Sequence, residues 1–318
     1  MSPVHDGADD QEQVLTREFD TARPVELDLS NTLGPVRVRL AETATTRVEV
    51  RHDPASAALD WRGGLTGLLS WVSGQFGESS GLGGTVERLG TERLRAAREV
   101  PVAEAVQATR VELTGNRLAV RTPSTAPLRA VPLAVVITAP QDSQLTVRTG
   151  SGAVEVRGRS GRVQIQAGSG EVSVESVTGQ AVARTGSGPL RLGEVRGGVQ
   201  ARSGSGDVEI AAVDGPSSVV TGSGSVWLGQ LRGDALVRSG SGDLSITDAV
   251  SGQAELITGS GELRVSLRAG TTAEVDLTSS TGTASSDLPV SEQPPEDEPG
   301  LRVYGRTGSG DALVTSAV

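Results

Sequence analysis

The sequence predicts an all-β protein, a single-stranded parallel β-solenoid (β-helix) with about 18 residues per coil, plus one inserted helical hairpin. Three observations lead to this prediction. The tripeptide Gly-Ser-Gly returns at a fixed period, apolar residues alternate after each copy, and no helical period competes with that alternation. The tripeptide begins at Gly150, Gly168, Gly186, Gly204, Gly222 and Gly240 in steps of 18, at Gly259 after a step of 19, and finally at Gly308.

Each repeat predicts two short strands. One variable residue follows Gly-Ser-Gly, and then apolar residues alternate, as at Val208 and Ile210, so that their side chains share one face. A second corner marked by glycine follows, and a second alternating pair such as Val199 and Ala201 leads to the next tripeptide. Strands this short need partners, so we expect the coils to stack about 4.8 Å apart. Trp227 lies between two inward positions and is expected to point outward.

The corners explain the abundance of glycine, which occurs 42 times. A tight corner needs either positive φ or a close approach between backbones, and glycine permits both. The serine of each tripeptide can form hydrogen bonds with its stacked neighbour. One extra residue near Ala249 and Val250 accounts for the longer step to Gly259 as a corner bulge.

The repeat extends toward the N-terminus in weaker form. The segment Ser30-Asn31-Thr32-Leu33-Gly34-Pro35-Val36-Arg37-Val38 has the same corner and alternation as the segment from Arg148 to Val156. We therefore expect one continuous β-solenoid domain over 15–318, interrupted by a helical insertion at 55–105 and an acidic loop at 291–300. Residues 1–14 are polar and are expected to form a disordered tail.

The insertion at 55–105 has a different composition from the repeats. It holds Trp61, Trp71 and Phe76, half of the six aromatic residues, and its apolar residues recur at helical spacing. A glycine-rich turn and a second helical run complete a predicted hairpin. Its apolar face either caps the open end or side of the solenoid or binds a protein partner or a membrane surface. A disordered loop is the third alternative for this segment. The candidate interaction residues are Trp61, Leu65, Leu68, Leu69, Trp71, Val72 and Phe76.

Composition excludes several functions. The 39 acidic and 29 basic residues give a net charge of −10, which disfavours nucleic acid as a partner. All basic residues are arginines and cysteine is absent, which excludes lysine and thiol chemistry, and His5 and His52 share no ligand spacing. We expect no cofactor and no metal. No signal peptide or transmembrane segment is evident, so we expect a cytoplasmic protein, at most peripheral to the membrane.

Two charged ladders flank the Gly-Ser-Gly corners. Arg184, Arg202 and Arg238 stand two residues before the tripeptide, whereas Asp207 and Asp243 follow it directly. They either bind an extended anionic or glycan ligand or form a solvated surface in which the charges compensate one another. Calcium-roll repeats need regular aspartates in both halves of a coil, and the second half lacks them. Because carboxylates recur at repeat positions rather than as one pair, we expect no enzyme; the alternative is a carbohydrate-active β-helix enzyme or a glycan-binding module.

Several segments together resemble a known family. They are Arg17-Glu18-Phe19-Asp20, Val25 to Asn31, the Gly-Ser-Gly coils, Ala273 to Leu277, and Ser286 to Val290. They resemble the bacterial putative-adhesin family, also called toastrack domains, over nearly the whole chain except 55–105. The resemblance implies a β-solenoid without enzymatic activity, often associated with envelope-stress systems. The expected function is a scaffold or adhesin-like interaction protein that binds a protein partner or a membrane surface through 55–105, with self-association as a further option.

Overall fold

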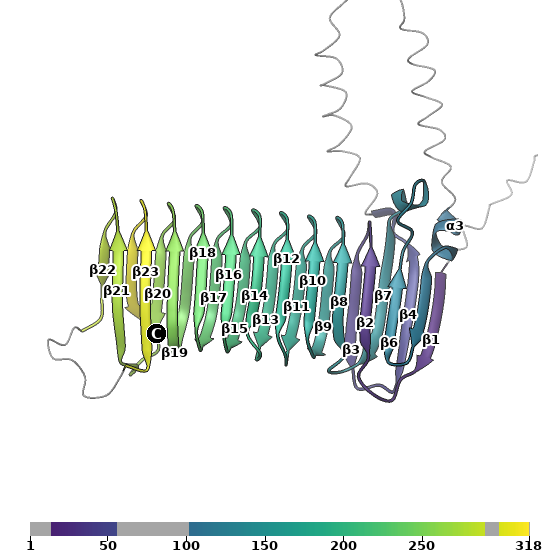
Figure 1. Ribbon diagram of the computed structural model, residues 1–318, viewed down its shortest axis with the longest axis horizontal. Coiled ribbons are helices and arrows are strands. Elements are labelled where there is room, and N and C mark those ends of the chain that lie inside the picture. Colours follow the sequence, from purple (N-terminus) through teal and green to yellow (C-terminus); the bar gives the residue numbers. More distant parts are fainter. Residues whose placement is uncertain (1–13, 56–101, 290–298, 318) are drawn as a thin grey trace, which may run out of the picture.

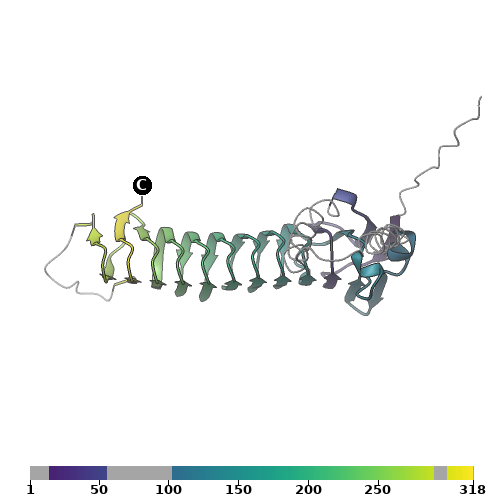
Figure 2. The ribbon, with the colours of Figure 1, turned by 90° about the horizontal axis from the view of Figure 1, so that it is seen from above.

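The computed structural model describes residues 14–55, 102–289 and 299–317. Strands dominate this part of the chain and lie side by side in one elongated row (Figures 1 and 2). All 24 strands of the described ranges belong to one hydrogen-bonded network. The expectation of an all-β, solenoid-like protein is therefore confirmed.

The strands pair in two series, here named sheet A and sheet B, and β19 continues from one into the other. In spatial order, sheet A holds β1 (Val14–Asp20), β4 (Thr45–His52), β7 (Leu133–Pro140), β3 (Val36–Ala41), β9 (Val154–Ser160), β11 (Val172–Val177), β13 (Leu190–Val195), β15 (Val208–Asp214), β17 (Val226–Arg232), the first half of β19 (Leu244–Thr258), β20 (Leu263–Leu267), β24 (Ala312–Ser316) and β22 (Ala284–Ser286). Sheet B holds β5 (Arg110–Thr114), β6 (Arg117–Arg121), β2 (Glu26–Asn31), β8 (Gln144–Thr149), β10 (Val163–Ala167), β12 (Ala181–Thr185), β14 (Val199–Ser203), β16 (Ser217–Thr221), β18 (Ala235–Ser239), the second half of β19, β23 (Leu301–Thr307) and β21 (Ala273–Ser279).

In the central strands, side chains alternate between the interior and solvent. The pairing there is parallel, and Val208 of β15 lies beside Val226 of β17, its equivalent in the next repeat. Val208 and Ile210 are 1% and 0% exposed, whereas Glu209 between them is exposed. Trp227 is 38% exposed, as its outward position predicts. The interior is thus filled by the alternating apolar residues of both sheets.

The longer step that leads to Gly259 is accommodated where β17 pairs with β19. Leu231 lies beside Ala249, but the next residue, Arg232, lies beside Ser251. Val250 is therefore the extra residue, and the predicted corner bulge is confirmed.

The two corners use glycine for different reasons. A Cβ on Gly206, in a Gly-Ser-Gly corner, would lie 2.1 Å from the carbonyl oxygen of Gly188 in the preceding coil. Close backbone approach therefore requires glycine there. Gly233, at the second corner, instead has a φ of 104°, a conformation that other residues rarely adopt.

The order of coils in space differs from their order in the sequence at both ends. The coil of β2 and β3 lies between the β6/β7 strands and the β8/β9 strands. The last coil, β23 and β24, lies between the β19/β20 strands and the β21/β22 strands. Gly308 thus stacks on Gly259, and its amide donates to the Thr258 carbonyl oxygen at 3.2 Å. The Gly-Ser-Gly row is continuous in space, and the coil without the tripeptide lies at the end.

The N-terminal end differs from the continuous parallel solenoid that was expected over 15–318. β1 and β4 pair antiparallel, and so do β4 and β7 and also β5 and β6. The helix α3 (Val102–Gln107) contacts β1, β4 and the 3-10 turn η2 (Leu128–Ala130), and its Ala105 and Val106 are buried. These elements cover the end of the parallel array. The strands β4 and β5 run against the direction of the array, whereas β1, which is antiparallel to β4, again runs with it.

The predicted insertion is only partly covered by the described residues. Its last four residues, 102–105, begin α3, which ends two residues later at Gln107. The candidate interaction residues Trp61, Leu65, Leu68, Leu69, Trp71, Val72 and Phe76 lie outside the described residues, as do 1–13 and most of the predicted acidic loop. Val14, the last residue of the predicted tail, begins β1. No helix within the described ranges is long and apolar enough to cross a membrane.

Candidate functional site

A row of buried hydroxyls connects neighbouring Gly-Ser-Gly corners. The hydroxyl of Ser239 accepts a hydrogen bond from the Gly242 amide at 2.8 Å and donates one to the Gly224 carbonyl oxygen of the preceding coil at 3.0 Å. Thr258 repeats both bonds one coil later, with Gly261 and Gly242. Because these hydroxyls are buried and bonded, the row holds the corners together. Thr307 joins two corners in the same way, through Gly310 and Gly261. The equivalent buried hydroxyls of the earlier coils bond within their own corner; they belong to Thr149, Thr185, Ser203 and Thr221.

The predicted aspartate ladder is also engaged in bonds between coils. The carboxylate of Asp207 accepts the amide of Ser225 at 2.8 Å, and that of Asp243 accepts the amide of Glu262 at 2.8 Å. Asp311 accepts both the amide and the hydroxyl of Thr283, and these bonds hold the pKa of its carboxyl below the usual value. Each carboxylate therefore takes an amide of the next coil in the stack.

The predicted arginine ladder is arranged differently. Arg184 and Arg202 are exposed neighbours in register on β12 and β14. Within the described residues, neither side chain has an ion-pair or hydrogen-bond partner. Arg238 stands two coils further on, and its guanidinium lies 3.7 Å from the carboxylate of Glu255. The structure therefore does not bring the arginine and aspartate ladders together as compensating pairs.

Other carboxylates are held by arginines. Asp28, whose side chain is 7% exposed, accepts the guanidinium groups of Arg117, Arg121 and Arg148 at 2.6, 3.2 and 3.3 Å. The carboxylate of Asp248 pairs with Arg268, and this bond is the main reason why its pKa lies below the usual value. The Asp28 group links β2 with strands that are distant in the sequence, whereas the pair of Asp248 and Arg268 joins successive coils.

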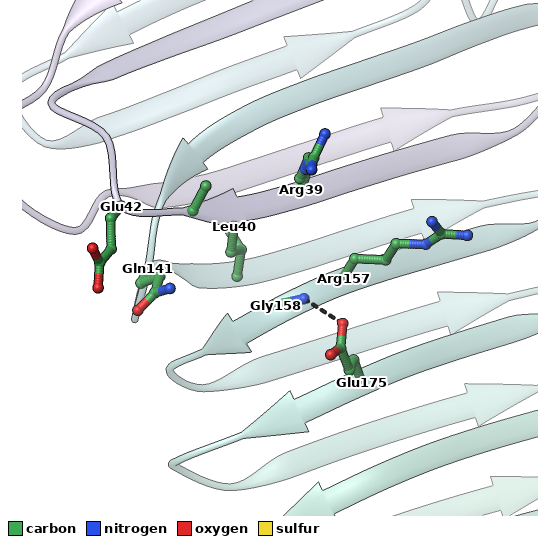
Figure 3. A pocket seen from close by; sticks show the side chains of 8 residues that line it. Arg39, Leu40, Glu42, Gln141, Arg157, Gly158 and Glu175 are labelled. Carbon is green, nitrogen blue, oxygen red and sulfur yellow. Dashed lines mark hydrogen bonds between the residues drawn. The ribbon is translucent and has the colours of Figure 1, made fainter.

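Sequence reasoning missed a hollow on the outer side of sheet A (Figure 3). Its volume is about 440 Å³, and it lies where β9 bulges at Gly158, whose φ is 87°. The freed amide of Gly158 donates to the Glu175 carboxylate at 2.8 Å. The lining residues are Arg39, Leu40, Ala41, Glu42, Gln141, Arg157, Gly158 and Glu175. A glycine between Arg157 and Arg159, inside a strand, was the available signal for the bulge.

A second hollow of about 610 Å³ continues along β9, β11, β13 and β15. Arg191, Glu209 and Ala211 are among its lining residues, and the Arg191 guanidinium lies 3.3 Å from the Glu209 carboxylate. Trp227 is the register partner of Glu209 on the next strand. In the described part of the chain, no group of three His, Cys, Asp or Glu side chains is placed to hold a metal ion.

Comparison with protein families identifies the architecture. A family model described as Toastrack DUF4097 matches residues 106–315, more than half of the chain. The chain belongs to the toastrack family. The matched range runs from α3 to β24 and so includes every Gly-Ser-Gly corner. The resemblance seen in the sequence segments is therefore confirmed.

Several solved structures are similar to this toastrack chain at low identity. A putative adhesin from Bacteroides fragilis has 10% identity and a TM-score of 0.41, with 95% of this chain and 97% of that chain covered. A putative lipid binding protein from Parabacteroides distasonis has 12% identity and a TM-score of 0.37, with 94% and 96% covered. A putative adhesin from Parabacteroides merdae has 9% identity and a TM-score of 0.35, with 95% and 97% covered. A search of curated proteins gives no significant match.

Proposed function

We propose that this toastrack protein is a non-catalytic scaffold or adhesin-like interaction protein, built as a parallel β-solenoid with one coil per Gly-Ser-Gly repeat. The observation that carries the proposal is the use of its carboxylates. Asp207, Asp243 and Asp311 each accept a backbone amide of a neighbouring coil, and Asp28 is surrounded by arginines. A glycosidase needs two carboxyl groups facing one cleft and free to move protons. The carboxylates named here are engaged in bonds that support the stack.

The partner-binding element in this proposal is the helical hairpin predicted at 55–105. The buried Ala105 and Val106 of α3 attach the end of this segment to the N-terminal end of the array. The array then serves as a stiff support that presents the segment. The proposal places the protein in the cytoplasm, peripheral to the membrane, and the family resemblance supports a link to envelope stress.

A double variant, Trp71→Ala with Phe76→Ala, tests the proposed binding role of the insertion. If the two rings bind a partner, the variant loses partner capture in a pull-down and keeps the melting temperature of the wild type. If the rings cap the solenoid, each truncation of a buried ring destabilises by roughly 3–5 kcal/mol, and the melting temperature falls. A fall in melting temperature with unchanged capture would contradict the proposal.

Glycan binding is the second candidate, and Trp227 favours it. The indole of Trp227 lies over Gly229, where an added Cβ would be 3.2 Å from the ring. Trp227 is also the register partner of Glu209, which lines the second hollow together with Arg191. An exposed ring can stack on a sugar while nearby charged groups bond its hydroxyls. A glycan-binding screen with wild type and Trp227→Ala tests this candidate, and a hydrolysis screen tests the carbohydrate-active enzyme.

A further inference from the structure

The two sheets differ in the charges that their strands carry. In the six sheet B strands from β8 to β18, the charged residues are four arginines, and there is no carboxylate. The five sheet A strands of the same coils carry five carboxylates and four arginines. Since the net charge of the chain is −10, this side of sheet B is a local reversal of charge. We name it the cationic face; its arginines are Arg148, Arg184, Arg202 and Arg238.

The arginines of the cationic face are accessible. Arg184 and Arg202 are exposed on adjacent strands, and among the described residues they have no carboxylate partner. Arg148 and Arg238 each lie near one carboxylate, yet both side chains remain 52% exposed. Beyond β18 the outer side of sheet B carries carboxylates as well as Arg306, so the carboxylate-free part of the face ends at β18; these carboxylates are Glu255, Glu274 and Asp276. Like charges on neighbouring strands repel, and an anionic partner would relieve that repulsion.

Apolar side chains stand between the arginines. Val220 and Ile257 take the arginine position in their coils, beside Arg238. Val182 and Leu236 lie on the same outer side, two residues before Arg184 and Arg238. All four are partly buried and face outward from the sheet. The cationic face therefore combines guanidinium groups with aliphatic side chains.

We infer that the cationic face docks onto an anionic lipid bilayer. Guanidinium groups bind phosphate oxygens in bidentate fashion and stay charged at any physiological pH. The row is interrupted by Gln166, Val220 and Ile257, so it does not match a rigid polyanion with a fixed charge spacing. Lipid headgroups in a fluid membrane can move to meet irregularly placed arginines, and the aliphatic side chains fit the boundary between headgroups and acyl chains.

The carboxylates of sheet A do not cancel this attraction. Packed sheets lie about 10 Å apart, and the charges of their outer sides are further apart still. The Debye length is about 8 Å at physiological salt, so the carboxylates on the outer side of sheet A are screened from a membrane that lies against sheet B. Each arginine near an anionic surface contributes about fivefold to the partition coefficient. Removal of two should weaken binding roughly 25-fold.

Vesicle flotation with the full chain tests this inference. Vesicles of phosphatidylcholine with added phosphatidylglycerol should carry the wild type upward at about 0.15 M salt, where the Debye length is short. Pure phosphatidylcholine vesicles should not, and high salt should release the protein. Arg184→Gln with Arg202→Gln should weaken partitioning roughly 25-fold.

The matched control removes the same charge from the other side. Arg191→Gln with Arg264→Gln changes two exposed arginines on the outer side of sheet A and should leave partitioning within about twofold of wild type. Equal loss in both double variants, or no preference for anionic vesicles, would overturn the inference. Binding to soluble heparin with the same affinity and arginine dependence would also overturn it. The variant of Trp71 and Phe76 should float like wild type, which separates this face from the insertion.

Discussion

Ile210 offers a sharp test of which side chains face the interior. It is 0% exposed, and its register partners on the adjacent strands are Leu192 and Leu228. Loss of such an aliphatic side chain costs about 2–5 kcal/mol, and a buried carboxyl without a partner adds about 1–3 kcal/mol even when protonated. Ile210→Asp should therefore destabilise by roughly 3–8 kcal/mol, against a typical total stability of about 5–15 kcal/mol. Glu209→Arg, on the same strand and exposed, should change stability by less than about 1 kcal/mol.

Urea denaturation followed by circular dichroism measures both variants. Because repeat arrays can unfold in segments, the first transition is the relevant one. Burial raises the pKa of the introduced carboxyl above its unfolded value of about 3.9. The folded variant then holds a proton that the unfolded chain releases, so its stability relative to wild type should fall further as pH rises from about 4 to 7. Equal shifts for Ile210→Asp and Glu209→Arg would refute the assignment of inward and outward positions.

Two further predictions concern a corner and an ion pair. Gly206→Ala places a methyl group 2.1 Å from the Gly188 carbonyl oxygen and should cost about 1–3 kcal/mol in thermal unfolding, whereas Gly300→Ala, where space is open, should be silent; equal effects would contradict the close-approach explanation. Asp248→Asn removes a carboxyl whose pKa is lowered by Arg268, so the variant should be less stable than wild type at neutral pH. The lowered pKa of Asp248 in the folded state stabilises the wild-type fold at pH values above the pKa of the unfolded chain, and this stabilisation is lost as pH falls through the folded-state pKa. The difference in stability between wild type and Asp248→Asn should therefore shrink below about pH 4. A difference that is independent of pH would argue against the ion pair.

Local signals were sufficient to predict the central coils. The alternation at Val208 and Ile210, the outward position of Trp227 and the extra residue at Val250 all depend on neighbours within one repeat. A period of two selects the buried face without knowledge of the partner strand. The hypothesis for Trp61 to Phe76 stays a prediction, since these residues lie outside the described part of the chain.

The order of the end coils depends on pairing between distant segments, which alternation does not encode. Gly305 was the available sequence signal for the order of the C-terminal coils. It takes an inward position on β23, beside Leu256 and Leu277, and an added Cβ would lie 2.7 Å from Leu277. The glycine makes room for Leu277 of β21, and this contact packs the coil of β21 and β22, which is outermost in space, against the coil of β23 and β24, which is last in the sequence. From the sequence alone, a glycine at this position indicates only a weak strand.

The separation of charge was also hidden in the sequence. Arg202 and Asp207 flank one Gly-Ser-Gly corner, and this proximity favoured a mutually compensating surface. The corner instead places Arg202 on a sheet B strand and Asp207 at the start of a sheet A strand, where its carboxylate accepts the Ser225 amide. The number of residues in a corner does not reveal which direction each side chain takes after it.

A distance between two spin labels tests the stacking of one coil per Gly-Ser-Gly repeat most directly. The chain has no cysteine, so Thr146→Cys and Leu236→Cys introduce unique labelling sites. The register between them runs through Gln164, Val182, Gln200 and Ser218, which is five strand steps. At about 4.8 Å per step, pulsed electron paramagnetic resonance should give one narrow distribution near 24 Å. A mean near half that value, as two repeats per coil would give, or a broad distribution would contradict the stacked array.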